Sequence, residues 1–189
     1  DLHTPIRRQA SDVYKRQGLA LAYKKNNNFN EGLASLDKLL EKYPKNLVLN
    51  TTKVEFLSYF NKFNDALDLA NKFLEISPKN YPLSISKSQI LLNMGQYFES
   101  EEIIRDQLLR KNDSPDLWFM LSETQKTSQN IVGYHQSRAE YFLLLGQDEK
   151  ALNQLEFALQ LTQNNFQVSD RIMTKIIEIK KSLQNSRGL

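Results

Sequence analysis

A helix-breaking segment recurs along this chain at a constant interval. Pro44 lies in KYPKN and Pro78 lies in ISPKN, and the same step beyond Pro78 reaches Asn112 in RKNDSPD. Proline cannot continue a helix, because it lacks the backbone N–H and clashes with the preceding turn. Breaks at an interval of about 34 residues therefore predict an all-α chain of two-helix repeats. The period sets the first three repeats at 13–46, 47–80 and 81–114, with each proline at position 32.

Small side chains recur at two further positions of the repeat. Two helices can approach closely only where the facing side chains are small, and an irregular helical bundle would not return such residues in both registers. Position 8, in the first helix, holds Ala20, Val54, Ser88, Ser122 and Ala139, and position 20, in the second, holds Gly32, Ala66, Ser100 and Ala151. Position 17 holds the aromatics Phe29, Phe63 and Tyr97, and Trp118, Leu121 and Ser122 repeat the W-x2-L-small opening of tetratricopeptide (TPR) repeats. We predict a TPR-like α–α superhelix, a solenoid of antiparallel helix pairs.

The spacing of two turn glycines departs from the period. Gly95 and Gly146 both fit position 15, but they lie one and a half periods apart. This predicts that the helix at 132–145 closes a fourth repeat (115–145) and also opens the last one (132–165). Residues 167–185 are predicted to form a C-terminal capping helix, because a terminal helix has one neighbour only and needs a polar outer face. The predicted inner stripe is Ile172, Ile176, Ile179 and Leu183, and the predicted outer face is Lys175, Glu178 and Lys181.

Residues 1–17 differ in character from the rest of the chain. Their end, DVYKRQ, resembles the translation of a transposon-end adapter used in sequencing libraries, so we expect residues 1–17 to be a non-native, irregular segment and the chain to be a fragment. A natural basic tail is the alternative. The segment carries four Lys or Arg and two Asp, a net +2 of the total formal charge of +3, and leaves +1 for the repeats. A nearly neutral array lacks the basic face that nucleic acid requires. We predict a TPR array over 18–185.

No motif for catalysis or cofactor binding occurs. The 189 residues include no cysteine and two histidines, and no HExxH, Gly-rich phosphate loop or GxSxG elbow is present. Glu101, Glu102 and Glu140 are expected to be solvated helix carboxylates, and His135 to be structural. No apolar run approaches the roughly 18 residues of a membrane span. We predict that this chain is not an enzyme and has no catalytic, cofactor or metal site.

The first helices of a stacked array line its concave surface, where ligands usually bind. We predict a peptide-binding face there, of mixed apolar, amide and carboxylate character, suited to an extended or helical segment. Its residues are Thr51, Glu55, Ser58, Ile85, Gln89, Leu92, Phe119, Glu123, Gln136 and Glu140. The known clamp for acidic chaperone tails is not predicted, because its Asn, Lys and Arg positions hold Leu21, Thr52, Pro82 and Ser86.

The C-terminal third also resembles one particular family. The segment His135-Gln-Ser-Arg-Ala-Glu-Tyr141, followed by Leu144 and Gly146, is similar to the HQ-x-R-A-E-Y-x-x-L-x-G stretch of the periplasmic β-barrel assembly-enhancing (BepA, or YfgC) zinc metalloproteases. Gly18-Leu-Ala-Leu-Ala22 resembles the GLALA opening of their TPR region, and the resemblance extends over 18–181. Asp148 departs from the pattern, since an aromatic is usual there.

The resemblance implies a role for the whole protein. Members carry an HExxH protease domain before the TPR array, so zinc is expected only in a missing upstream domain and not in this chain. The array would act in the periplasm of a Gram-negative bacterium. It would dock the outer-membrane β-barrel assembly machinery, unfolded outer-membrane clients and its own protease domain for quality control. The alternative is a stand-alone TPR scaffold or adaptor of another bacterial assembly.

Overall fold

The computed structural model describes residues 18, 20, 22–162 and 164–187, and the adapter-like segment predicted at 1–17 lies outside them. Within the described part of the chain every regular element is a helix and no strand occurs, which confirms the predicted all-α fold. The chain divides into two compact units, Asp1–Gly95 and Gln96–Leu189. Their boundary falls inside the third predicted repeat, between its two helices.

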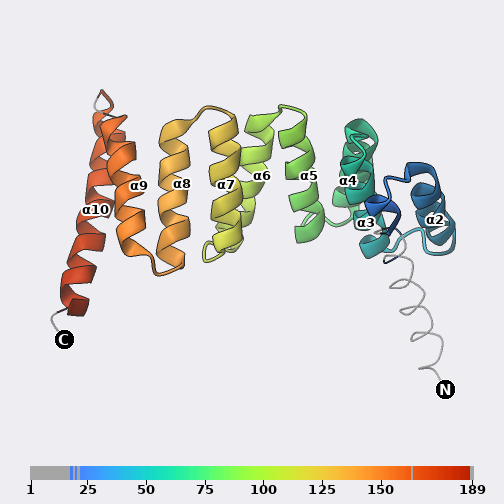
Figure 1. Cartoon of the computed structure of the whole chain (residues 1–189), viewed down its shortest axis with the longest axis horizontal. Helices are drawn as coiled ribbons and strands as arrows, with labels where there is room; N and C mark the ends of the chain where they lie inside the picture. The colour runs from blue at the N-terminus through green and yellow to red at the C-terminus, as the bar shows by residue number, and fades with distance from the viewer. Residues whose placement is uncertain (1–17, 19, 21, 163, 188–189) are drawn as a thin grey trace, which may run out of the picture. The chain divides into compact units, whose positions relative to one another are not determined.

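The first unit contains the helices α2 (Phe29–Lys42), α3 (Leu47–Tyr59), α4 (Phe63–Ile76) and α5 (Tyr81–Asn93). The helices α3 and α5 begin at the first residues of the second and third predicted repeats (Figure 1). Each has an asparagine N-cap, in which the side chain accepts a bond from an otherwise unpaired N–H of the first turn. Asn46 Oδ1 accepts from Leu49 N at 3.1 Å, and Asn80 Oδ1 accepts from Leu83 N at 3.0 Å.

The second unit contains α6 (Tyr97–Arg110), α7 (Pro115–Thr127), α8 (Ile131–Leu144), α9 (Asp148–Gln160) and α10 (Phe166–Arg187). The helices α7, α8 and α9 lie side by side, each packed along its neighbour (Figure 1). Asn130 and Asn165 cap α8 and α10, accepting from Gly133 N at 3.1 Å and Val168 N at 3.2 Å.

Every small residue predicted for a close helix approach is buried. None of the alanines, serines or Val54 at these positions exposes more than 1% of its surface, and Gly32 is buried as well. A Cβ added to Gly32 would meet Phe56 Cε2 at 2.7 Å, so even alanine is too large there. These crossings confirm the TPR-like packing that the period predicts.

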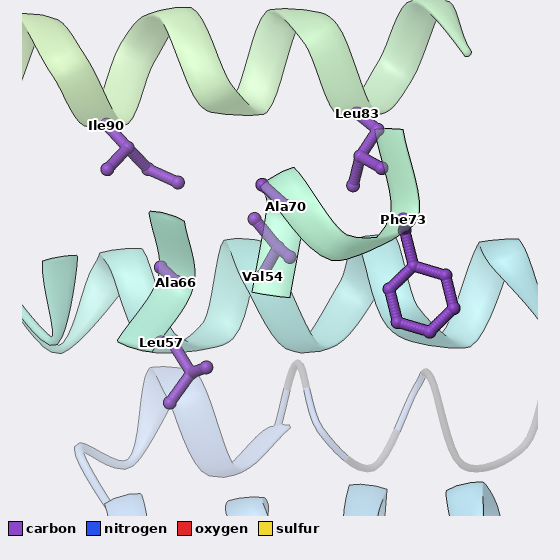
Figure 2. Packing of buried hydrophobic residues seen from close by; sticks show 7 residues of the cluster. All are labelled: Val54, Leu57, Ala66, Ala70, Phe73, Leu83 and Ile90. Carbon is purple, nitrogen blue, oxygen red and sulfur yellow. The ribbon is translucent and has the colours of Figure 1, made fainter. Parts of the chain in front are cut away.

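Apolar side chains from successive helices fill each unit. In the first unit, Leu83 and Ile90 point from α5 toward α4 and α3 (Figure 2). The rest of this cluster consists of Val54, Leu57, Ala66, Ala70 and Phe73. In the second unit α8, α9 and α10 share a core of Ala139, Ala151, Leu155, Ala158, Ile172, Ile176 and Ile179.

One residue in the left-handed backbone region ends the first helix of each pair. These residues are Asn27, Asn61, Gly95, Gln129 and Gly146, with φ between 53° and 78°. All five occupy position 15, where the chain reverses direction in a short turn. Only the two glycines stand out in the sequence. Asparagine tolerates this conformation, whereas Gln129 gives no such signal.

The positions of these turns show that α8 is used twice. The residues Gln129, before α8, and Gly146, after it, both form the turn that leads from a first helix to a second helix. The offset between the starts of α7 and α8 equals that between the starts of α3 and α4, and the offset from α8 to α9 is one residue longer. The offset from the start of a second helix to the start of the next first helix, as from α4 to α5, is longer than both of these offsets. Hence α8 is the second helix after α7 and the first helix before α9.

The polar outer face predicted for the capping helix is only partly correct. Helix α10 covers the predicted 167–185 and buries Ile172, Ile176 and Ile179. Lys175, however, faces α8, because its Nζ lies 3.1 Å from a carboxylate oxygen of Glu140. The exposed side of α10 also carries Met173 and Ile177, which are 44% and 58% exposed. The predicted inner stripe is therefore correct for the three isoleucines, but the predicted outward direction of Lys175 is wrong.

Candidate binding faces

The helices α3 and α5 bring together the predicted binding residues of the first unit. Glu55 Oε1 accepts a hydrogen bond from Ser86 Oγ at 3.4 Å, so the two first helices adjoin along this side. Glu55 and Gln89 are exposed, and Ser58, Ile85 and Leu92 are half-buried. The face thus offers a carboxylate, an amide and apolar carbon within a few turns of helix.

Thr51 contributes little to this face, contrary to the prediction. It is 8% exposed, and its Oγ1 donates to Leu47 O at 2.9 Å. A threonine hydroxyl readily bonds the carbonyl four residues earlier in a helix. The predicted spacing placed Thr51 on the correct helix, but it lies on the buried edge of the stripe.

Phe119 and Glu123 lie against one side of α8. The guanidinium of Arg138 is 4.7 Å from the ring centre of Phe119 and 5.1 Å from that of Tyr141. Its Nη1 is 3.7 Å from Glu123 Oε1, which is too long for a hydrogen bond, and this buried nitrogen has no hydrogen-bond partner among the described residues. Arg138 is therefore held by aromatic faces and a loose ion pair rather than by directed bonds.

Gln136 and Glu140 lie on another side of α8, in a pocket. Their neighbours include Arg105 of α6 and Arg171 and Lys175 of α10. Residues advance by about 100° along a helix, so Gln136 and Arg138 point about 160° apart, toward nearly opposite sides of α8. The structure therefore divides the four predicted residues of the second unit between two faces. The cause is the double use of α8, which faces α7 on one side and α9 and α10 on the other.

No motif or repeat position in the sequence indicated a functional role for Arg105, Arg138, Tyr141 or Arg171. Arg138 and Tyr141 belong to the HQSRAEY segment, whose order was noted only as a family resemblance. Their i, i+3 spacing on a helix that also holds Phe142 could have indicated an arginine among aromatic rings. Arg105 and Arg171 meet only through the fold, since they lie on α6 and α10 with three helices between them in the chain, and no local pattern indicates this.

His135 is a packed side chain, as expected. Its Nδ1 lies 2.8 Å from Gln154 Oε1, and its ring centre is 5.5 Å from that of Phe157 on α9. It thus links α8 to α9. No cluster of three or more His, Asp or Glu side chains that could hold a metal ion occurs among the described residues. Nor is any helix in that part of the chain long and apolar enough to cross a membrane.

The helix pairs, close crossings and recurring turns define a TPR-like helical-repeat fold. Among solved structures, the chain is similar to MamA (41-end) from Desulfovibrio magneticus RS-1, with a TM-score of 0.61 at 12% identity over 90% of this chain and 96% of that one. A MamA RS-1 double mutant gives 0.61 at 12% identity, over 92% and 97% of the two chains.

A tetratricopeptide repeat protein from Parabacteroides merdae is also similar, with a TM-score of 0.54 at 14% identity over 86% of this chain and 70% of that one. Identities this low establish the fold and no more. No protein-family model matches the sequence, and no curated protein sequence matches it either.

Proposed function

We propose that this chain is a protein–protein interaction module that binds an extended or helical polypeptide segment. The observation that carries the proposal is the side shared by α3 and α5, where Glu55 and Gln89 are exposed beside half-buried Ile85 and Leu92. Alternating polar and apolar groups along adjoining helices suit the mixed surface of a peptide. The TPR-like fold supports this reading, because stacked helix pairs create extended binding surfaces.

In its more specific form, the proposal makes the chain the interaction region of a periplasmic zinc metalloprotease. It would dock the outer-membrane β-barrel assembly machinery or its unfolded clients for quality control. The support is the resemblance of the HQSRAEY segment and of the Gly18–Ala22 opening to the BepA family. The alternative, a stand-alone TPR scaffold of another bacterial assembly, shares the fold and differs only in what precedes it.

A binding experiment tests the general proposal. The probe is a urea-denatured outer-membrane β-barrel protein, diluted into a solution of the full chain, with the complex measured by fluorescence anisotropy. Glu55→Lys should weaken binding several-fold, because it reverses the charge in the middle of the face. Asp68→Lys is the matched control, since Asp68 is also exposed but lies on α4, a second helix. Equal loss in both variants, or in neither, would contradict the choice of face.

The uninterrupted gene distinguishes the specific proposal from its alternative. An HExxH-bearing domain encoded before Gly18 supports the metalloprotease. A start codon or a different domain at that place supports the scaffold. Sequencing the source genome across this boundary decides between them, whatever the binding experiment shows.

A further inference from the structure

A pocket of about 240 Å³ opens in the second unit between α6, α8 and α10. Its walls include three cationic side chains, one from α6 and two from α10. They are Arg105, Arg171 and Lys175. Trp118, Leu155 and Ile172 add apolar carbon to the lining. The pocket thus combines positive charge with an apolar wall.

Two of the three cations have carboxylate partners. Arg105 binds Glu101 Oε1 through Nε at 2.9 Å and Nη2 at 2.6 Å, and Lys175 lies 3.1 Å from Glu140. Arg171 is exposed and has no hydrogen bond or ion pair with any residue that the structure describes, and the same holds for the amide of Gln136. Within the described residues, the pocket therefore carries one uncompensated positive charge and one free amide.

A buried hydrogen-bond network holds the floor of the pocket. The fully buried Gln125 donates through Nε2 to Glu101 Oε1 at 2.9 Å and accepts from Ser137 Oγ at 2.7 Å. Glu101 of α6, which also binds Arg105, is thereby tied to α7 directly and to α8 through Gln125. This network positions the guanidinium of Arg105 before any ligand arrives, which lowers the entropy cost of binding.

The size of the pocket indicates what it can take. Small-molecule sites are typically about 300 to 1,000 Å³ and mostly apolar, so this pocket suits a single side chain better than a whole ligand. A second pocket, of about 460 Å³, shares Arg105, Gly133 and Gln136 with it and continues past Val132, Leu161 and Val168. A chain anchored in the first pocket can therefore extend along the second.

We infer that this groove binds an extended, acidic polypeptide segment, with one Asp or Glu carboxylate received by Arg171, Gln136 and Arg105 and the next apolar residues lying on Val132, Leu161 and Val168. The inference rests on the proposed function and names the chemistry of the partner at this site. A polyphosphate ligand suits the groove less well, because it has no apolar groups to lie on Val132, Leu161 and Val168.

The test uses two fluorescent decapeptides, one alternating valine with glutamate and the other alternating valine with glutamine. The full chain should bind the glutamate peptide about tenfold more tightly, since a hydrogen bond to a charged group is worth about a factor of ten. Arg171→Gln should remove most of this preference, and added salt should weaken it. Arg110→Gln is the matched control, because Arg110 lies on α6 outside the groove and pairs with Asp106. Circular dichroism should be unchanged in both variants.

Three results would overturn the inference. They are equal binding of the two peptides, a preference that survives Arg171→Gln, and displacement of the glutamate peptide by inorganic phosphate at equal concentration. If any of these occurs while Glu55→Lys still weakens binding of the denatured barrel protein, the proposed function stands and only the acidic site is wrong. If the barrel protein fails to bind but the glutamate preference depends on Arg171, the acidic site stands and the choice of the side shared by α3 and α5 is wrong.

Discussion

Gln129 and Gly146 occupy the same place in two successive turns, with φ of 62° and 67°. One turn leads into α8 and the other leads out of it, and both have the geometry that joins a first helix to a second. In a regular array the two kinds of turn alternate. Because these two residues are equivalent, α8 serves as both a second and a first helix. This double use places Phe119 and Glu123 on a different face from Gln136 and Glu140.

Any side chain at Gly146 should lower the free energy of unfolding, because the residue has a positive φ. Nothing lies within 4 Å of a Cβ added there, so Gly146→Ala tests backbone strain alone. We expect a loss of about 1 kcal/mol in the free energy of unfolding, because a left-handed conformation is unfavourable for alanine. Gln129→Gly should change it by less than about 0.5 kcal/mol, since relief of strain is offset by a more flexible unfolded chain. Urea denaturation measures both, and an unchanged Gly146→Ala variant would contradict the argument.

Gly32→Ala should destabilise the first unit although alanine favours helices. The added Cβ would lie 2.7 Å from Phe56 Cε2, and Phe56 is 2% exposed and packed between Phe29 and Phe60. Overpacking of this kind costs about 1 to 3 kcal/mol. The control is Ala34→Gly on the exposed side of α2, which should cost about 1 kcal/mol through helix propensity alone. A higher melting temperature for Gly32→Ala would show that Phe56 moves aside freely.

Arg138 should stabilise α7 against α8 mainly through its stacked contacts. Arg138→Ala removes contacts with Phe119, Tyr141 and Phe142 and should cost about 2 kcal/mol. Arg138→Met should lose less than half of that amount, because it keeps the apolar stem and removes a buried nitrogen for which the described residues provide no hydrogen bond. Chemical denaturation of the two variants provides the comparison. Equal losses would mean that the charge, rather than the packing, matters at this position.

The buried amide of Gln125 should be coupled to Ser137. Gln125→Leu removes the bonds to Glu101 and Ser137 and leaves the buried serine hydroxyl without this acceptor, so we expect a loss of about 2 kcal/mol. Adding Ser137→Ala should recover about 1 kcal/mol, since no unsatisfied hydroxyl then remains at that position. A double-mutant cycle measured by urea denaturation tests this coupling. Simple additivity of the two single changes would contradict it.

Periodicity made the fold predictable. The constant interval between helix breaks and the small residues at positions 8 and 20 predicted helix pairs, and α3, α5 and α7 begin at Leu47, Tyr81 and Pro115, where the repeats were expected to start. These positions can be recognised in the sequence because the two helices of each repeat approach closely at the same place, and only a small residue fits there. The turn at Gln129 was recognised only from the spacing of the glycines, because a left-handed glutamine has no local signature.

The candidate site was less predictable. Counting positions within each repeat placed Glu55 and Gln89 on exposed surface, but it also selected the buried Thr51. It also assigned Phe119 and Gln136 to one face. The repeat positions are numbered anew from α8, and this numbering does not show that the two side chains point to different sides of that helix. The pocket joins residues as distant in the chain as Arg105 and Arg171, and such a combination depends on how α6 and α10 pack around α8.

The double use of α8 has an evolutionary consequence. In an ordinary repeat protein, a two-helix unit can be duplicated or deleted because its ends are interchangeable. Here the helix from Ile131 to Leu144 must satisfy α7 as a second helix and α9 as a first helix, so most substitutions meet two sets of constraints. Related chains should therefore gain or lose repeats on either side of this helix, and its own residues should diverge more slowly than those of its neighbours.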